Sequence, residues 1–375
     1  MSFTVGVVGV SGERCVRAGA VAAALCVAAA TGGCVISQVY QLGALYYAYG
    51  PETVVEVAAT MPVPPEDRCL AAMELAMANL ELGRYGSVDD ALAPCAGPPA
   101  DLEPDRMFYG GEPHEIVWRE VVRTSAALAL QDGTAAAAAA DRLVAEIEGS
   151  ACGDCRFDFA RWVAALGYQA GWRWRDSVRT LADGYAADPV SDVLARELVQ
   201  SWQRSRVVPG FAPPPAGVDP ARELVMILLL GMGPDKTGTD QFDDGRFVRT
   251  APGYERIPGG TREAIARVDD RPWVRAAVLT DVDELAERAL EARRELRGVE
   301  TEFGSQWMLT TSGMDLRHWG SLPAVGAGLR LPVPSAAERV TLRYLDEFGL
   351  ELGRETFDVP SGWRQGPLYV VRRVP

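Results

Sequence analysis

Three stretches of the sequence share one helical-hairpin pattern, and this pattern constrains the fold more than any other feature. They cover residues 69–95, 119–145 and 158–189. Each stretch contains an apolar-periodic segment, a break, and a second segment with small residues along one face. The repetition predicts α-helical hairpins in series. Stacked hairpins form a scaffold with a concave face that suits a bound peptide or helix.

The spacing within the three stretches resembles the tetratricopeptide repeat. That repeat has, in order, a small residue, a large residue, a turn, an aromatic residue and a second small residue at fixed positions. The third stretch fills these positions with Ala165, Tyr168, Trp172, Trp174 and Ser177. The first fits at Ala76, Gly83 and Tyr85, and the second at Ala126, Gly133 and Ala138. We therefore expect a tetratricopeptide-like hairpin solenoid over residues 34–206; the alternative is an unrelated helical bundle.

The pattern changes after a proline-rich linker at residues 207–221. Residues 223–230 (ELVMILLL) predict a buried strand, and a second strand is expected at 274–279. Residues 281–298 predict a charged helix with Asp281 as its N-cap. Alternating segments predict strands of a small antiparallel β-sandwich, at 327–334, 338–346, 352–360 and 367–374. The expected fold class is α+β, with residues 222–375 as a C-terminal α+β domain.

The first 33 residues have the composition of an export signal. Glu13, Arg14 and Arg17 are their only charges, and residues 18–30 are apolar throughout. Cys34 directly follows a small-residue segment, as in a bacterial lipobox, although Thr31 stands where leucine is usual. We predict a signal peptide at 1–33 and lipidation of Cys34; the alternative is an uncleaved anchor helix. In a Gram-negative host, Val35 after the cysteine favours the outer membrane, facing the periplasm.

Cysteine usage agrees with export to an oxidising compartment. Removal of the signal and lipidation of Cys34 leave four cysteines, Cys69, Cys95, Cys152 and Cys155. Cys69 and Cys95 lie at the two ends of the first hairpin, where antiparallel helices bring chain ends together. This placement predicts a Cys69–Cys95 disulfide. Cys152 and Cys155 predict a local structural bridge, since no expected strand or helix N-terminus marks them as a redox pair.

The sequence gives no pattern for catalysis, a metal or a nucleotide. The net charge of −14 repels a phosphate backbone, so nucleic acid is not an expected partner. Lys236, the only lysine, follows Asp235 instead of the glycine that a phosphate loop requires. Residues 240–245 resemble a calcium loop but lack the closing glutamate. His114 and His318 lie in no known catalytic motif. We expect no enzyme activity, no cofactor and no metal.

Taken in order, these landmarks resemble an uncharacterised family of bacterial envelope lipoproteins with tetratricopeptide-like repeats and a C-terminal β domain. Residues 108–115 (FYGGEPHE) resemble the family's segment before its second hairpin, and residues 229–236 its strand and Gly-x-x-Pro-x-Lys turn. The most specific match is an Asp-x-Arg-x-Trp-x-x-Leu-Pro motif, formed by Asp315, Arg317, Trp319, Leu322 and Pro323. The resemblance implies location and architecture but no reaction.

The leading functional hypothesis is a lipid-anchored adaptor of the cell envelope that binds an envelope protein through its helical surface. The candidate contact residues are Trp162, Tyr168, Trp172 and Trp174, for which packing between helices is the alternative. The second hypothesis is a structural component of an envelope assembly that docks through its C-terminal β domain. A cell-wall-acting enzyme is a third, for which the sequence offers no converging carboxylates.

The lipoprotein prediction is tested by the intact mass of membrane-extracted protein beside a Cys34→Ala variant. We expect a wild-type mass that corresponds to an acylated chain beginning at Cys34, and loss of that species in the variant. A soluble chain that retains Met1 would contradict lipidation and would remove the basis for export.

Overall fold

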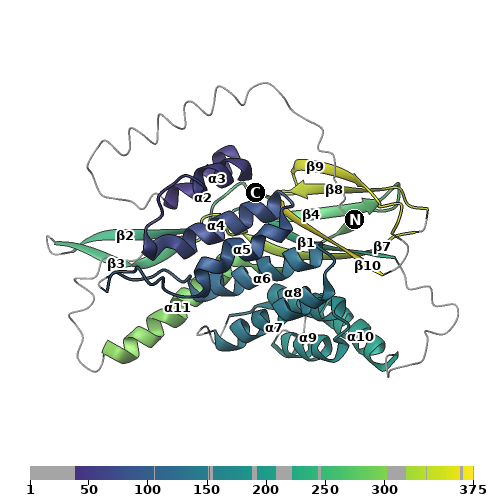
Figure 1. Cartoon of the computed structure of the whole chain (residues 1–375), viewed down its shortest axis with the longest axis horizontal. Helices are drawn as coiled ribbons and strands as arrows, with labels where there is room; N and C mark the ends of the chain where they lie inside the picture. Colours follow the sequence, from purple (N-terminus) through teal and green to yellow (C-terminus); the bar gives the residue numbers. More distant parts are fainter. Residues whose placement is uncertain are drawn as a thin grey trace. The chain divides into compact units, whose positions relative to one another are not determined.

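The structure is a computed structural model that describes residues 39–104, 106–150, 152, 155–187, 192–207, 222–243, 246–301, 318–334, 336–363 and 366–374. The predicted signal peptide, Cys34, Asp315, Arg317 and almost all of the predicted linker lie outside the described residues. The fold is α+β, with helices in the N-terminal half and β-sheets in the C-terminal half (Figure 1). No helix among the described residues has both the length and the apolar character needed to cross a membrane.

Each predicted hairpin stretch contains two packed helices. The pairs are α4 (Arg68–Glu81) with α5 (Val88–Leu92), α6 (Pro113–Ala129) with α7 (Gly133–Gly149), and α8 (Asp158–Ala170) with α9 (Trp174–Ala187). Short 3-10 turns flank the first pair, at η1 (Pro65–Asp67), η2 (Tyr85–Ser87) and η3 (Ala93–Ala96). Three further helices, α2 (Tyr40–Tyr49), α3 (Pro51–Ala58) and α10 (Asp192–Val207), have no counterpart among the elements predicted from the sequence.

Small residues let successive helices approach closely. A Cβ atom on Gly167 of α8 would lie 2.7 Å from the Ala136 carbonyl oxygen and 3.0 Å from Ala140 Cβ, both on α7. Gly133, at the start of α7, likewise leaves no room for a side chain beside the Ala170 carbonyl. Helix α6 packs on both α7 and α8, so consecutive hairpins are layered on one another. The small residues therefore set the spacing of the helical layer.

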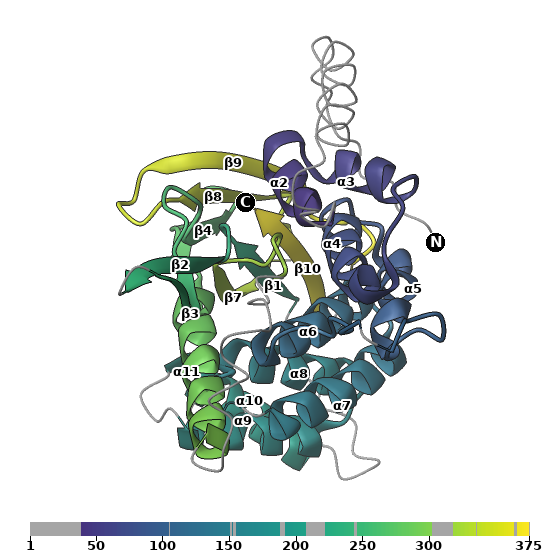
Figure 2. The same cartoon turned by 90° about the vertical axis from the view of Figure 1, so that its left-hand side faces the viewer.

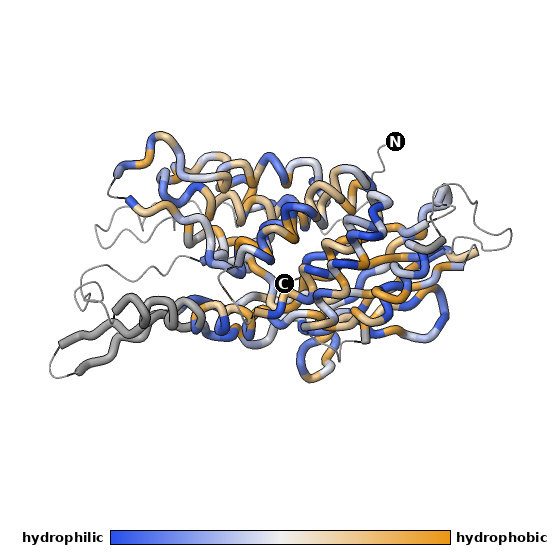
Figure 3. The backbone as a smooth tube through the Cα atoms, turned by 90° about the horizontal axis from the view of Figure 1, so that it is seen from below, coloured by the Kyte–Doolittle hydropathy of each residue, from blue (hydrophilic) through white to orange (hydrophobic). Residues whose placement is uncertain are grey.

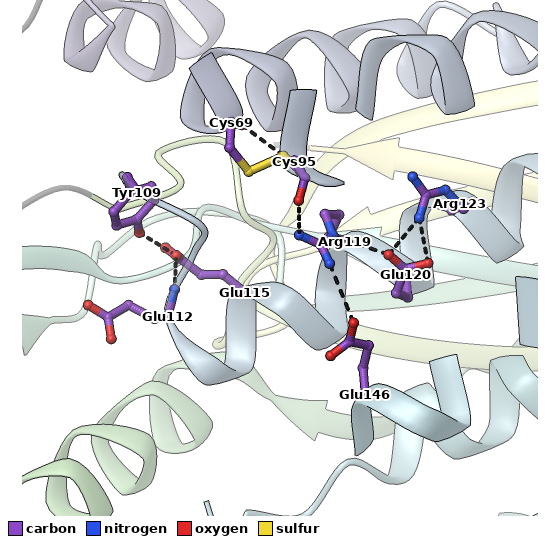
Figure 4. The surroundings of a disulfide bond; sticks show 9 residues. All are labelled: Cys69, Cys95, Tyr109, Glu112, Glu115, Arg119, Glu120, Arg123 and Glu146. Carbon is purple, nitrogen blue, oxygen red and sulfur yellow. Dashed lines mark hydrogen bonds and ion pairs between the residues drawn. A yellow bond between two sulfur atoms is a disulfide. The ribbon is translucent and has the colours of Figure 1, made fainter. Parts of the chain in front are cut away.

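The predicted disulfide joins Cys69, in the first turn of α4, to Cys95 in η3, with 4.5 Å between the two Cα atoms (Figure 4). Cys152 and Cys155 are also paired, with Cα atoms 5.3 Å apart. Both cysteine pairs of the prediction thus lie at disulfide distance. A bridge across a chain separation of 26 residues stabilises the folded state by roughly 3–4 kcal/mol, chiefly by restricting the unfolded chain.

The described strands form two four-stranded sheets and a separate hairpin. The inner sheet has the order β10 (Pro367–Val374), β1 (Glu223–Leu230), β7 (Val325–Pro332), β6 (Ala277–Asp281). The outer sheet has the order β5 (Val274–Arg275), β4 (Glu263–Val268), β8 (Arg339–Leu345), β9 (Glu351–Asp358). The hairpin consists of β2 (Asp235–Asp243) and β3 (Arg246–Glu255). Helix α11 (Val282–Thr301) follows β6, and the Asp281 carboxylate caps it by accepting from the Asp283 N–H, as predicted.

All strands expected from the sequence are present, but their pairing is not wholly antiparallel. Strand β10 runs parallel to β1, with Glu223 opposite Pro367 and Leu230 opposite Val374. Strands β8 and β9, which precede β10 in the chain, belong to the outer sheet. The chain then crosses back to the inner sheet, where β10 pairs with β1 and runs in the same direction. The expected strand at 274–279 is divided into β5 and β6, one in each sheet. Strands β2, β3 and β4 were not predicted.

Strand β1 lies between two apolar layers, which explains its unbroken hydrophobic run. All eight of its residues are buried. Leu224, Met226, Leu228 and Leu230 pack in the core between the two sheets, with residues of β4 and β8. Because strand side chains alternate, the residues between them face the helical side of the sheet. Figure 3 shows that the helices and the strands both carry hydrophobic and hydrophilic stretches.

The helical layer packs directly on the inner sheet. Helices α4 and α6 contact β10, and α8 contacts β6 and β7 (Figure 2). Strand β7 carries glycines where the aromatic residues of the helices meet it. Gly326 lies against Phe159 and Trp118, and Gly328 lies against the Trp162 ring. The order of layers is therefore helices, inner sheet, outer sheet.

Gly328→Ala should destabilise the fold, because the added Cβ would lie 2.8 Å from Cη2 and 2.9 Å from Cζ3 of Trp162. We expect a loss of about 1–3 kcal/mol in the free energy of unfolding, measured by urea denaturation. Gly362→Ala is the matched control, since a Cβ there meets no atom within 4 Å. Equal free energies of unfolding for the two variants would show that the Trp162 ring moves away from residue 328 without a loss of stability.

Candidate functional site

Three segments far apart in the sequence meet at one place, which we call the motif junction: residues 112–115, 231–236 and 318–323. Lys236 Nζ lies 2.5 Å from Glu112 Oε1. The Trp319 N–H donates to Glu115 Oε1 over 2.6 Å, and the Gly233 N–H donates to the Leu322 carbonyl over 2.7 Å. Each segment belongs to one of the three motifs that carry the family resemblance. The tertiary structure therefore joins these motifs through direct hydrogen bonds and an ion pair.

Two buried glutamates hold the backbone of residues 318–323. Glu115 of α6 accepts the Trp319 N–H, and Glu74 of α4 accepts the next one, from Gly320, over 2.7 Å. Glu74 also accepts the Ser321 N–H, at 3.2 Å and 3.3 Å from its two oxygens. Glu74 and Glu115 are each only 1% exposed. Two helices thus bind consecutive backbone amides of one loop through carboxyl groups, which are stronger acceptors when they are ionised.

The carbonyl groups of this loop are bound from other elements. Tyr47 of α2 donates its hydroxyl hydrogen to the Gly320 carbonyl over 2.8 Å. Arg373 of β10 donates to the Ser321 carbonyl over 3.2 Å. The Trp319 indole N–H donates to the Ser321 hydroxyl over 2.9 Å, so this buried ring also has a polar partner. Helices α2, α4 and α6 and strand β10 all converge on the loop.

Glycine is required where α2 crosses the loop. A Cβ on Gly320 would lie 3.0 Å from Gly43 Cα and 3.1 Å from Glu74 Oε1. A Cβ on Gly43 would lie 2.9 Å from Gly320 Cα. The two backbones therefore touch without side chains between them. This contact brings the Glu74 carboxylate within reach of the loop amides.

Burial shifts the protonation of several junction groups. It raises the pKa of Glu74 from 4.5 to about 7, and hydrogen bonds from Ser321 and Gly320 oppose the shift. Burial also raises the pKa of Tyr109, whose hydroxyl donates to Glu115 (Figure 4). The pKa of His114 is lowered, mainly by burial. The Glu74 carboxyl therefore titrates near neutral pH.

Both histidines and the only lysine of the chain lie at the junction. His318 Nε2 is 2.9 Å from Asp235 Oδ1, and the His114 ring packs edge-on against Tyr254 with centroids 5.6 Å apart. The Lys236 side chain is 1% exposed and directed to Glu112. It therefore sits inside the fold, where a phosphate group in solvent does not reach it.

The junction is a packed polar centre, and its carboxylates are engaged with backbone amides. Two surface cavities of about 540 Å³ and 370 Å³ lie elsewhere, at Arg222 and Trp363 and along α10, and neither is lined by a junction residue. Within the described ranges, no three His, Cys, Asp or Glu side chains are grouped as metal ligands. The arrangement can fix the loop and exchange a proton at Glu74.

The structure separates the four aromatic residues proposed as a binding surface. Trp162 is 1% exposed and Tyr168 2%, so both belong to the core. Trp172 is 76% exposed at the turn between α8 and α9, with φ at +60°. Trp174 is half-buried and packs edge-on against Trp172, with centroids 6.4 Å apart. For Trp162 and Tyr168 the burial favours the alternative of packing, since Trp162 contacts the inner sheet and Tyr168 contacts helix α7.

Sequence reasoning found some of the junction and missed the rest. Trp319, Leu322 and Pro323 were singled out with the late motif. Glu74, Tyr47 and Arg373 were not. Glu74 had one detectable signal, because it is the only charge inside the apolar segment CLAAMELAMANL of α4. No local pattern marks Tyr47 or Arg373, which lie 273 and 52 residues from their partners in the loop.

No protein-family model matches the sequence, and no curated protein is significantly similar to it. The identification of the motif junction as the candidate site therefore depends on its geometry: buried acceptors, consecutive amides and convergent elements.

Glu74→Gln should change how stability depends on pH. The pKa of Glu74 is about 7 in the folded chain and near 4.5 in the unfolded chain. The Glu74 carboxyl therefore binds its proton more tightly in the folded state. Its contribution to stability is therefore present below pH 4.5 and is lost as the pH rises to 7. Relative to wild type, the variant should gain up to about 3 kcal/mol in free energy of unfolding between pH 4.5 and 8.

Glu56→Gln, on the exposed face of α3, is the matched control variant. Urea denaturation at several pH values measures the difference. Parallel curves for wild type and Glu74→Gln would mean that Glu74 does not titrate in this range.

Proposed function

We propose that this chain is a lipid-anchored cell-envelope protein that acts as a protein-binding scaffold through tetratricopeptide-like hairpins. The observation that carries the proposal is the Cys69–Cys95 pair, which spans the first hairpin. A buried disulfide is typical of proteins exported to an oxidising compartment. The same bridge stiffens a helical pair, which lowers the entropic cost of presenting a binding surface.

The packing of the helical layer limits where a partner can bind. The side of α6 and α8 that carries Trp118, Phe159 and Trp162 is filled by the inner sheet. The partner surface therefore lies on other faces of the layer. Trp172 is the strongest candidate, because it is 76% exposed and tryptophan is enriched among residues that dominate binding energy. Arg173, which stacks on Tyr168 at 4.7 Å, adds a charged group beside it.

A second candidate function is a structural component that docks through the β domain. Strand β9 forms one edge of the outer sheet as described. Three large apolar side chains are exposed at its start and in the turn before it, Phe348 (85%), Leu350 (64%) and Leu352 (46%). Unpaired edges with apolar neighbours are places where another chain can add a strand. An enzyme acting on cell-wall polymer has less support, because Glu74 and Glu115 are both committed to loop amides.

Trp172→Ala should abolish capture of an envelope partner by in-cell crosslinking while changing stability by less than about 0.5 kcal/mol. The physical reason is that the side chain is mostly exposed and contributes little to the core. Trp162→Ala, by contrast, should cost about 3–5 kcal/mol, because the ring is fully buried. Melting curves of both variants provide the comparison.

Phe348→Ser separates the two candidate functions. If capture survives Trp172→Ala but fails in Phe348→Ser, docking occurs through the β domain. If neither change affects capture, both surfaces are the wrong ones.

A further inference from the structure

The chain's two disulfides differ in the length of chain that they close and in their accessibility. Cys69 and Cys95 are separated by 26 residues and are 0% and 9% exposed. Cys152 and Cys155 are separated by three residues; Cys152 is 5% exposed, whereas Cys155 is half-buried. Because the stabilisation by a disulfide grows with the loop that it closes, the short bridge contributes less to the folded state. A structural role therefore explains the second bridge less well than the first.

The chain around Cys155 leads into the N-terminus of a helix. Cys155 lies three residues before α8, and the Cys155 N–H donates to the Cys152 carbonyl over 3.3 Å. A helix N-terminus and a cation stabilise a thiolate that lies close to them, and the exposed Arg156 follows Cys155 directly in the sequence. Asp158, buried in the first turn of α8, opposes this effect. The sequence analysis expected no helix N-terminus beside this pair, and α8 supplies one.

We propose that Cys152–Cys155 is a thiol-exchange site, at which an external thiol forms a mixed disulfide with Cys155 and Cys152 is the resolving thiol. The external thiolate attacks Cys155 Sγ because Cys155 is the more accessible residue of the pair. The bond between Cys155 Sγ and Cys152 Sγ breaks, and its electron pair leaves with Cys152 Sγ, which takes a proton from solvent.

The exchange is completed by a second external thiolate, which attacks the external sulfur of the mixed disulfide. The products are an external disulfide and the Cys155 thiolate, so two electrons pass from two external thiols to the protein. In the reverse direction the Cys155 thiolate attacks an external disulfide, and Cys152 resolves the mixed species. The chemistry requires only a thiol or a disulfide from solution.

The site adjoins a contact between the helical layer and the β half of the chain. Cys155 Sγ lies 3.9 Å from the Leu285 carbonyl of α11. A few residues later, the Phe159 N–H donates to the Thr280 hydroxyl of β6 over 3.1 Å. A group attached to Cys155 therefore lies against the first turns of α11. Exchange at this site is placed to alter the contact between α11 and the segment that leads into α8.

The test uses the full chain in buffers with graded ratios of reduced to oxidised glutathione, followed by acid quenching, alkylation and peptide mass spectrometry. We expect Cys152–Cys155 to open at ratios where Cys69–Cys95 stays oxidised, so the Cys69–Cys95 bridge is an internal control. Opening of both bridges together, or only on unfolding, would overturn the proposal. This measurement needs no variant.

Two variants then identify the attacked sulfur. Cys152→Ser should accumulate glutathione on Cys155, whereas Cys155→Ser leaves the buried Cys152, which should react with a thiol reagent at least tenfold more slowly. Equal or reversed rates in two variants with unchanged melting curves would also overturn the proposal. The outcome is independent of the proposed scaffold function, which concerns Trp172 and a protein partner.

Discussion

The binding of two consecutive loop amides by Glu74 and Glu115 is the interaction on which the arrangement of this fold depends. These carboxylates come from α4 and α6, and the amides belong to Trp319 and Gly320, just before β7. Each bond joins residues more than 200 positions apart. Loss of one acceptor would leave buried amides unsatisfied, which costs about 1–3 kcal/mol for each group. The helical layer and the inner sheet are therefore held in register at this loop.

The aromatic–glycine contacts extend this attachment along the sheet. Phe159 and Trp162 of α8 lie over Gly326 and Gly328 of β7, in the same strand that follows the glutamate-bound loop. The hydrogen bonds of the two glutamates position the helices at the loop before β7. The aromatic–glycine contacts bury apolar surface between the helices and the rest of that strand. As a consequence, the helical face expected to be concave and open is an internal interface. The proposed partner contact is therefore assigned to the outer faces of the layer, where Trp172 is exposed while Trp162 and Tyr168 are buried.

The oxidised cysteines divide the same fold into stable and reactive parts. Cys69–Cys95 is buried beside a dense network of charges, in which Arg119 reaches the Cys95 carbonyl and pairs with Glu120 (Figure 4). Cys152–Cys155 lies in the segment before α8, with Cys155 half-buried and α11 beside it. Burial protects the Cys69–Cys95 bridge from thiols in solution, whereas the Cys152–Cys155 bridge is open to exchange through Cys155.

The sequence alone determined the local elements: the hairpin helices, the buried run of β1, the C-terminal strands and the Asp281 cap, because periodicity and capping are encoded by neighbours within a few residues. It also determined which cysteines pair. It did not determine the parallel pairing of β10 with β1, nor the convergence of Glu74, Lys236, Trp319 and Arg373, because these contacts join residues far apart in the chain. Burial of Trp162 and exposure of Trp172 were likewise decided by tertiary packing, since both residues belong to the same hairpin pattern and differ only in which neighbours cover them.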